Sequence, residues 1–268
     1  MSLAFSVVGI GLLGPGLTDW ASGQALLRDG ALWHSTPTVV PAPQRLPPTE
    51  RRRAGTVVKA SIVVADQALS ACGLDAAALA TVFTSSTGDP TNCHILCEAL
   101  ALPLPDRLVS PTRFTNSVHN APAGYWHIAA ASRAPSTSLA AFDASFAAGL
   151  LEAAVQCAST QAPVLLVACD VPYPEPLHAV RPVTDVFAVA LVLAPPAGGR
   201  VLTLQTTAST TAGFASSTCS DPALEQLRCA IPAARALRLL QALAGGAAQT
   251  LWLEAQTGLA LQVSVAAA

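Results

Sequence analysis

The sequence predicts an α/β fold in which helices cover both faces of a sheet. Continuous apolar runs bounded by turn residues, at 162–170 ("APVLLVACD") and 186–195 ("VFAVALVLAP"), are typical of strands buried on both faces. Segments with apolar residues at helical spacing alternate with these runs along the chain. Strands that alternate with helices in this way build layered α/β domains with covered sheets.

The first predicted elements are a strand, a short helix and a long helix. The strand covers 5–13, and the glycines and proline after it indicate a turn before a helix that begins near Asp19. A proline-rich connection at 35–50 leads into a helix predicted over 50–73, which ends at a glycine. The next predicted elements are a strand at 80–89, a helix at 91–102, helical composition over most of 114–135, a strand at 136–142 and a helix at 147–159.

A shift in composition at 195–200 ("PPAGGR") separates the last part of the chain from the rest. A proline-rich loop at 171–182 precedes the strand at 186–195 on the first side of this shift. On the other side the sequence predicts a strand at 201–208, a Ser/Thr-rich loop, helices near 222–230 and 232–244, and strands at 250–255 and 259–265.

The composition indicates a large buried surface. Hydrophobic residues make up 52% of the 268 residues and charged residues 11%, against roughly 25% charged in typical globular domains. A membrane span needs about 20 apolar residues with few or no charges, and residues such as Asp143 and Glu152 interrupt the apolar runs. We therefore expect a cytoplasmic protein without a membrane span, which covers its apolar surface against itself and a partner.

Charge and cysteine usage exclude several classes of function. The formal net charge is −2, and the single basic run, Arg51–Arg53, is typical of a solvated helix face, so we expect no nucleic acid partner. Seven scattered cysteines argue against a disulfide framework. Cys93 and Cys97 lack a second ligand pair at metal spacing, and "TGDP" at 87–90 has too few glycines to cradle a phosphate. We therefore expect neither a metal nor a cofactor.

The segment "DASFAAG" at 143–149 forms a small-residue corner between a predicted strand and a predicted helix. Such corners hold the nucleophile in many α/β enzymes, and Ser145 is the candidate here. Both glycines of the G-x-S-x-G pattern are absent, and His178 follows Asp170 too closely for the usual serine, acid, histidine order. A serine after a strand is usually a helix cap. An acyl-transferring or hydrolytic enzyme with Ser145 as nucleophile is therefore the alternative hypothesis.

The order of segments resembles the β-ketoacyl synthases of the thiolase superfamily. "VVGIGLLGPGLTDWASGQALLRDG" is similar to their opening strand, turn and helix, and "ERRRAGTVVKASIVVADQALSACGLD" to their arginine-started helix. "FTNSVHNAPAGYWHIAAASRAPSTSLAAFDASFAAGLLEAA" is similar to the block of helix, turn, strand and corner that carries their cysteine. The resemblance implies a thiolase-like layered fold, with a ketosynthase N-terminal half at 1–195 and a reduced C-terminal half at 196–268 packed on it as a single compact unit.

Two departures from the family imply that catalysis is lost. Alignment of Gly149 with the glycine after the family's cysteine places Phe146 in the nucleophile seat, and a one-residue slip places Ser145 there. Phenylalanine cannot take over an acyl chain as a cysteine thiolate does. The family's second half supplies two histidines, whereas no histidine follows His178 here.

These departures resemble the chain-length factors, and the short form resembles the ketosynthase-like subunits of aryl polyene and xanthomonadin-type pigment clusters. The resemblance implies a non-catalytic subunit that forms a heterodimer with an active β-ketoacyl synthase, meets acyl carrier protein through that complex, and shapes the tunnel of a growing polyene in type II polyketide biosynthesis. A stand-alone homodimer that binds fatty acyl chains is a third hypothesis. The residues implied at the partner interface and tunnel are Phe114, Asn116, Ser117, Val118, His119, Ser138, Leu139 and Phe142.

Overall fold

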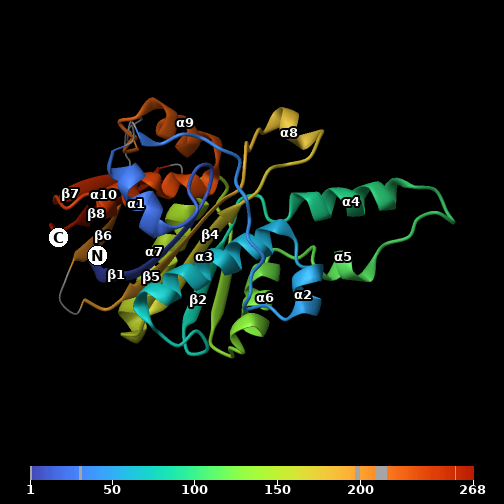
Figure 1. Cartoon of the computed structure of the whole chain (residues 1–268), viewed down its shortest axis with the longest axis horizontal. Coiled ribbons are helices and arrows are strands. Elements are labelled where there is room, and N and C mark those ends of the chain that lie inside the picture. Colours follow the sequence, from blue (N-terminus) through green and yellow to red (C-terminus); the bar gives the residue numbers. More distant parts are fainter. Residues whose placement is uncertain (1, 30–31, 197–199, 209–215, 257) are drawn as a thin grey trace.

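A single mixed sheet forms the centre of the computed structural model, which describes residues 2–29, 32–196, 200–208, 216–256 and 258–268 (Figure 1). In this part of the chain the strand order is β3-β2-β4-β5-β1-β6-β8-β7. β2 runs parallel to β3 and β4, and the other neighbours are antiparallel. The strands are β1 (Ser2–Leu13), β2 (Ala80–Thr84), β3 (Ser136–Leu139), β4 (Val164–Asp170), β5 (Phe187–Ala194), β6 (Val201–Ala208), β7 (Gln249–Gln256) and β8 (Leu259–Val265).

Helices cover both faces of this sheet, as the sequence predicts. Alternate residues of β5 enter two separate cores: Ala188 and Ala190 lie in the core shared with α3 and α6, whereas Val189 and Leu191 lie in the core shared with α7. Both cores draw on continuous apolar strands, because a strand covered on two faces has no polar side. The helices are α1 (Trp20–Arg28), α2 (Pro48–Arg53), α3 (Thr56–Cys72), α4 (Pro90–Ala101), α5 (Pro111–Thr115), α6 (Ala121–Ala130), α7 (Ser145–Thr160), α8 (Leu177–Val180), α9 (Pro222–Ala230) and α10 (Leu237–Ala244).

Two glycines of β1 allow α3 to lie directly on the strand. A Cβ atom on Gly9 would lie 2.2 Å from the carbonyl oxygen of Ala68, and one on Gly11 would lie 1.9 Å from the carbonyl oxygen of Val64. Both oxygens belong to the helix backbone, which cannot turn away as a flexible side chain can. The glycines of "VVGIG" therefore set the distance between the sheet and its covering helix.

The prediction of one continuous helix over 50–73 is wrong, because the structure has two helices in this segment. α2 ends at Arg53, Ala54 and Gly55 are extended, and α3 begins at Thr56. The side-chain amide of Asn116 donates to the carbonyl of Arg53 at 3.0 Å, which replaces the bond that a continuous helix would supply. Gly55 also faces the carboxylate of Asp89, where a Cβ atom would lie 2.2 Å from Oδ2. The predicted helix end at Gly73 is confirmed, with that glycine in the left-handed conformation.

Other segments differ from their predictions in length. The region 114–135 contains the end of α5, a turn and then α6, which begins at Ala121 with Pro122 in its first turn. Strand β3 ends at Leu139 rather than at residue 142. The proline-rich segment after β4 contains the short helix α8. Part of the predicted Ser/Thr-rich loop, 209–215, lies outside the described residues.

The last part of the chain continues the same sheet. β6 pairs with the first residues of β1, and β8 and β7 follow it outward. A 3₁₀ turn at Pro232–Ala236 and α10 pack into the core beneath α7, which they share with Leu150. Figure 1 shows the two chain ends close together beside these strands. None of the described helices is long and apolar enough to cross a membrane.

Candidate functional site

The corner between β3 and α7 is held from inside by Ser145. Its hydroxyl donates to the carbonyl of Phe142 at 2.7 Å and accepts from the amide of Ala141 at 3.0 Å. The residue is 1% exposed. An activated serine needs a general base within hydrogen-bond reach, and here the hydroxyl donates to a backbone carbonyl instead. The predicted role as a helix cap is therefore not observed, because the N-cap of α7 is Ala144 and the Ser145 hydroxyl instead binds backbone groups of the corner before the helix.

Phe146 lies one residue further along and faces the core. It is 1% exposed and packs with Ala147 and Leu150 of the same helix. The cavity that it lines together with Arg235 and Trp252 measures about 10 Å³, which holds about one water molecule at most. The aromatic ring therefore occupies the space at the start of α7, and among the described residues this cavity is too small for an acyl chain.

Arg181 connects the corner to two other segments. Its guanidinium lies over the ring of Phe142, with 3.7 Å between Cζ and the ring centroid. It also forms an ion pair with Asp143, and it donates to the hydroxyls of Ser86 at 2.9 Å and Tyr173 at 3.2 Å. A planar fork that stacks and donates in several directions is a property of arginine and not of lysine.

Asp143 lies between two arginines from distant parts of the chain. Arg181 approaches one carboxylate oxygen, and Arg235 approaches the other at 3.3 Å. Arg235 also pairs with Glu254 of β7 at 3.1 Å. The Asp143 carboxylate is 41% exposed, so each ion pair contributes little to the stability of the fold on its own. Together they link the corner to the last part of the chain. Sequence reasoning missed this network, because its members are separated by 38 and 92 positions.

Strand β3 is an edge strand, with β2 as its neighbour in the described chain. Ser138 and Leu139 are half-buried near its end. Phe142 is exposed three residues beyond the strand, at 65%. An unpaired edge flanked by an exposed aromatic side chain is a surface that can pair with another chain.

The segment 114–119 approaches the same region through the loop after β2. The His119 ring nitrogen Nε2 lies 3.0 Å from the carbonyl oxygen of Ser85, next to the Ser86 that Arg181 contacts. Phe114 and Val118 are exposed, at 68% and 52%. The tertiary structure therefore brings His119 and Arg181 to one loop. A common surface that includes Val118 and Phe142 stays a prediction.

Asn116 and Ser117 hold this segment in place. The Asn116 amide donates to the carbonyl of Arg53, and its oxygen accepts from the Tyr125 hydroxyl at 3.1 Å. The Ser117 hydroxyl donates to the carbonyl of Phe114 at 2.8 Å. Asn116 is buried. Both side chains support the turn between α5 and α6, and their place at an interface stays a prediction.

The buried carboxylate of Asp170 fixes the loop after β2. One of its oxygens, Oδ1, accepts the amides of Ser86 at 2.7 Å and Thr87 at 2.9 Å, and also the hydroxyls of Ser85 and Thr87. Burial raises the pKa of this carboxyl group, and the hydrogen bonds from Thr87 and Ser86 oppose that rise. An acidic residue at the end of a wholly apolar strand was the sequence signal for this anchor.

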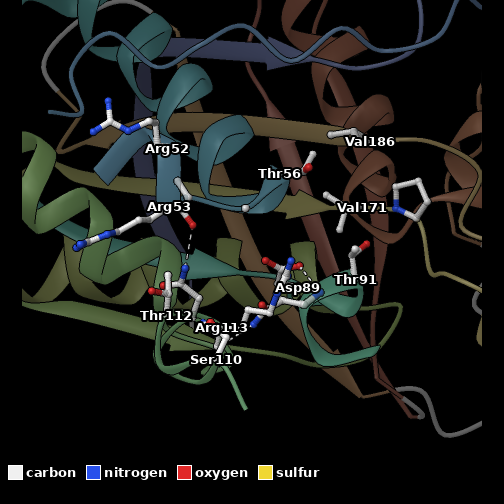
Figure 2. Close-up of a pocket in the computed structure, with 15 residues that line it drawn as sticks. Arg52, Arg53, Thr56, Asp89, Thr91, Ser110, Thr112, Arg113, Val171 and Val186 are labelled. Atoms are coloured by element: carbon white, nitrogen blue, oxygen red, sulfur yellow. Dashed lines mark hydrogen bonds between the residues drawn. The ribbon is translucent and has the colours of Figure 1, made fainter. Parts of the chain in front are cut away.

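A pocket of about 680 Å³ lies between the end of α2, the start of α3, and helices α4 and α5 (Figure 2). Arg52, Arg53 and Arg113 line it, together with the Asp89 carboxylate. Burial raises the pKa of Asp89, whereas the amide of Asn92 and the charge of Arg113 lower it. Arg53 pairs with Glu50, and Figure 2 shows the guanidinium groups of Arg52 and Arg53 directed away from Asp89. All three arginines are exposed, so their positive charge lies at the rim of the pocket and favours an anionic surface beside it. The sequence analysis predicted a solvated helix face for Arg52 and Arg53, assigned nothing to Arg113, and missed the pocket.

Metal and disulfide chemistry find no support in the described chain. No group of three histidine, cysteine, aspartate or glutamate side chains is positioned there to hold a metal ion. All seven cysteines are free thiols.

Comparison with known protein families shows to which family this chain belongs. The model described as "Beta-ketoacyl synthase, N-terminal domain" matches residues 20–255. The chain belongs to this β-ketoacyl synthase family. The predicted thiolase-like layered fold is therefore confirmed for this ketosynthase-family chain, and the match continues past residue 195 into the last strands.

Solved structures agree with this assignment. A chain of "Ketosynthase (ApeO) in Complex with its Chain Length Factor (ApeC) from Xenorhabdus doucetiae" is 26% identical, with a TM-score of 0.72 over 98% of this chain and 99% of that one. "The ishigamide ketosynthase/chain length factor" is 14% identical, with a TM-score of 0.70 over 99% of both chains. "AntDE:AntF (apo): type II PKS acyl-carrier protein in complex with its ketosynthase bound to the hexaketide" is 12% identical, with a TM-score of 0.68 over 100% of both. No curated protein matches the sequence.

Proposed function

We propose that this ketosynthase-family chain is a non-catalytic chain-length factor that forms a heterodimer with an active β-ketoacyl synthase. The observation that carries the proposal is the state of the corner before α7. No cysteine stands there, the Ser145 hydroxyl is bonded to the backbone, and Phe146 is buried. A condensing enzyme must hold the acyl chain on a nucleophile, so the chain needs a partner that supplies one.

The partner is proposed from the similarity and from the edge of the sheet. The 26% identical structure is a complex of a ketosynthase with its chain length factor. Here the edge strand β3 and the exposed side chains Phe114, Val118 and Phe142 offer a surface for such a complex. A face covered by a partner would also keep apolar surface from water in a chain with 52% hydrophobic residues.

In this complex the chain shapes the acyl tunnel of its partner. The pairing edge consists of Ser138, Leu139 and Phe142. The segment 114–119, which includes His119, reaches toward the tunnel, and within this segment Asn116 and Ser117 support the turn. The product class follows from the resemblance to short chain-length factors: a polyene of the aryl polyene type, made by type II polyketide chemistry. Residues 1–195 and 196–268 act as a ketosynthase-like half and a reduced half of one compact unit.

The arginine pocket is proposed to receive acyl carrier protein within the complex. A structure with the same fold contains an acyl-carrier protein together with its ketosynthase. The exposed arginines at the rim of the pocket, Arg52, Arg53 and Arg113, offer positive charge to an anionic surface of such a carrier protein. This contact would orient the carrier protein beside the partner's nucleophile.

Co-expression with ketosynthases from the same organism tests the proposal. We expect one of them to co-purify with this chain in a one-to-one complex, and we expect polyene synthesis on carrier protein to need both subunits. A stable monomer that co-purifies with none of them overturns the proposal. A homodimer that binds fatty acyl chains without a ketosynthase would establish the third hypothesis instead.

The enzyme hypothesis is tested separately by intact-mass measurement after incubation with acyl thioesters. The geometry does not favour it, because the Ser145 hydroxyl is 1% exposed and already donates to Phe142. We expect no covalent adduct. An acyl adduct that disappears in Ser145→Ala would establish Ser145 as a nucleophile.

A further inference from the structure

We propose that Phe142 is a preformed anchor that inserts into the ketosynthase partner, and that Arg181 is the residue that positions it. The inference rests on the proposed function, since it names the side chain that carries the heterodimer contact. It concerns a residue that contributes little to the chain's own core. Phe142 is 65% exposed, whereas Phe146, four residues later, is 1% exposed.

The backbone of Phe142 is in an unfavourable conformation. Its φ angle is +51°, in the left-handed region that a bulky side chain rarely adopts. Glycine would occupy this position without strain. Strained residues persist where the surroundings determine them, and they concentrate at functional sites. Glycine would suit this position better, and the ring of Phe142 is directed to solvent. The stability of the fold therefore does not explain the presence of a large aromatic side chain here.

Two sets of contacts impose this conformation. From inside, Ser145 donates to the Phe142 carbonyl twice, from the hydroxyl at 2.7 Å and from the amide at 3.3 Å. From outside, Arg181 lies over the ring at 3.7 Å. The next residue, Asp143, is held by Arg181 and Arg235. The backbone of Phe142 is therefore fixed from inside and its ring from outside, although most of the residue's surface is exposed.

Arg181 is itself fixed by groups from two other elements. It donates to the Ser86 hydroxyl on the loop after β2 and to the Tyr173 hydroxyl after β4. That loop is in turn anchored by the buried Asp170. The stacking of Arg181 on Phe142 is thus part of a rigid arrangement. A lysine at position 181 could not reproduce both the stacking and the fork of donors.

The position of the ring indicates a protein partner. It lies three residues beyond the edge strand β3. Arg181 contacts the loop after β2, as does His119, whose neighbour in the chain, Val118, is exposed. Aromatic side chains that are already ordered before binding make the strongest interface anchors, because little conformational entropy is lost when they insert. An exposed, immobilised phenylalanine at a sheet edge fits this description.

Substitution of Phe142 by glycine separates binding from folding. Glycine relieves the left-handed strain, so we expect the isolated chain to melt at an equal or higher temperature. We expect the dissociation constant of the complex with the co-purified ketosynthase to rise roughly 30-fold or more. Phe142→Tyr keeps the ring and should bind nearly as wild type. The control is Leu74→Ala, an exposed apolar residue just before β2 and thus at the opposite end of the parallel strands β2 and β3.

A double-variant cycle tests the role of Arg181. We expect Arg181→Lys to raise the dissociation constant roughly 2- to 12-fold, the cost of reordering one mobile side chain on binding. Since Arg181 acts through Phe142, the Phe142→Gly/Arg181→Lys variant should bind no more weakly than Phe142→Gly. Unchanged binding of Phe142→Gly overturns the anchor while leaving the heterodimer intact. Additive effects of the two substitutions overturn the positioning role of Arg181. If wild type binds no ketosynthase, the proposed function fails and the anchor with it.

Discussion

The hydroxyl of Ser145 donates a 2.7 Å hydrogen bond to the carbonyl of Phe142, so the nucleophile candidate of the sequence is a clamp on the corner. The same hydroxyl accepts from the Ala141 amide, and both bonds lie inside the protein. A side chain used in this way stabilises the turn into α7. Its chemistry at a substrate would first require that the corner open.

Ser145→Ala should therefore cost stability and leave function unchanged. We expect the free energy of unfolding to fall by about 0.5–1.5 kcal/mol for the lost bonds, or somewhat more because the Ala141 amide loses its acceptor. Denaturant unfolding measures this change. Partner-dependent polyene synthesis should survive in the variant. A folded Ser145→Ala chain that binds its partner but abolishes synthesis would contradict the prediction.

Phe146→Ala should destabilise the chain strongly. The ring is 1% exposed at the start of α7, where the adjoining cavity is already close to one water in size. Removal of a buried aromatic side chain costs about 3–5 kcal/mol through lost burial and the cavity that it leaves. Phe146→Leu is the matched control and should cost clearly less. Equal losses in the two variants, measured by urea unfolding, would show that the ring does not fill this space.

Gly11→Ala should also destabilise, for a different reason. Its Cβ atom would lie 1.9 Å from the backbone oxygen of Val64, so α3 would have to move off the sheet. Overpacking of this kind costs about 1–3 kcal/mol. Gly124 of α6 is the control, because a Cβ atom there has no neighbour within 4 Å. Gly124→Ala should stabilise by about 0.5–1 kcal/mol through helix propensity. Thermal melts that shift in the same direction would contradict this prediction.

Glu225 should make the stability of the fold depend measurably on pH in the acid range. Hydrogen bonds from the Arg228 side chain, opposed by partial burial and aided by the Cys219 amide, lower the pKa of Glu225 to about 2. A carboxyl group with a depressed folded-state pKa contributes stability above its unfolded pKa, near 4.3, and loses it as the pH falls toward 2. The melting temperature of Glu225→Gln should thus lie below that of wild type at pH 7. The gap should close between about pH 4.5 and 2, and a gap constant over that range would contradict the assignment.

The arginine pocket should contribute to carrier-protein binding. Arg52→Glu/Arg53→Glu reverses two charges that line the pocket, and we expect it to weaken binding of acyl carrier protein to the heterodimer by roughly tenfold or more at low salt. The effect should shrink at high ionic strength, because exposed charges are screened. The single variant Arg52→Glu is compared with Arg133→Glu, which changes the net charge by the same amount at an exposed arginine in the turn before β3. Equal weakening by both variants would indicate a general charge effect and no docking site.

Local patterns in the sequence were sufficient for most of the fold. The apolar runs at 162–170 and 186–195 became β4 and β5, since a strand covered on both faces shows an unbroken apolar run whatever its neighbours are. Gly73 ended its helix for an equally local reason, as it adopts the left-handed backbone. The corner before α7 was also found from its small residues.

Long-range contacts decided the remainder. The helix expected over 50–73 is divided because Asn116 takes the carbonyl of Arg53 across 63 positions. The charge network at the corner joins Asp143 to Arg181 and Arg235, and no periodicity reports such pairs.

The sequence by itself determined the layers, the family resemblance and the absence of a cysteine nucleophile, because these depend on residue type and on spacing along the chain. Only the tertiary structure decided that Ser145 is a buried clamp and that Phe142 is the exposed ring beside it. Side chains three positions apart face opposite environments here because the backbone turns at Phe142, with its φ of +51°. Contacts with Arg181, 39 residues later in the sequence, fix the ring that this turn directs outward.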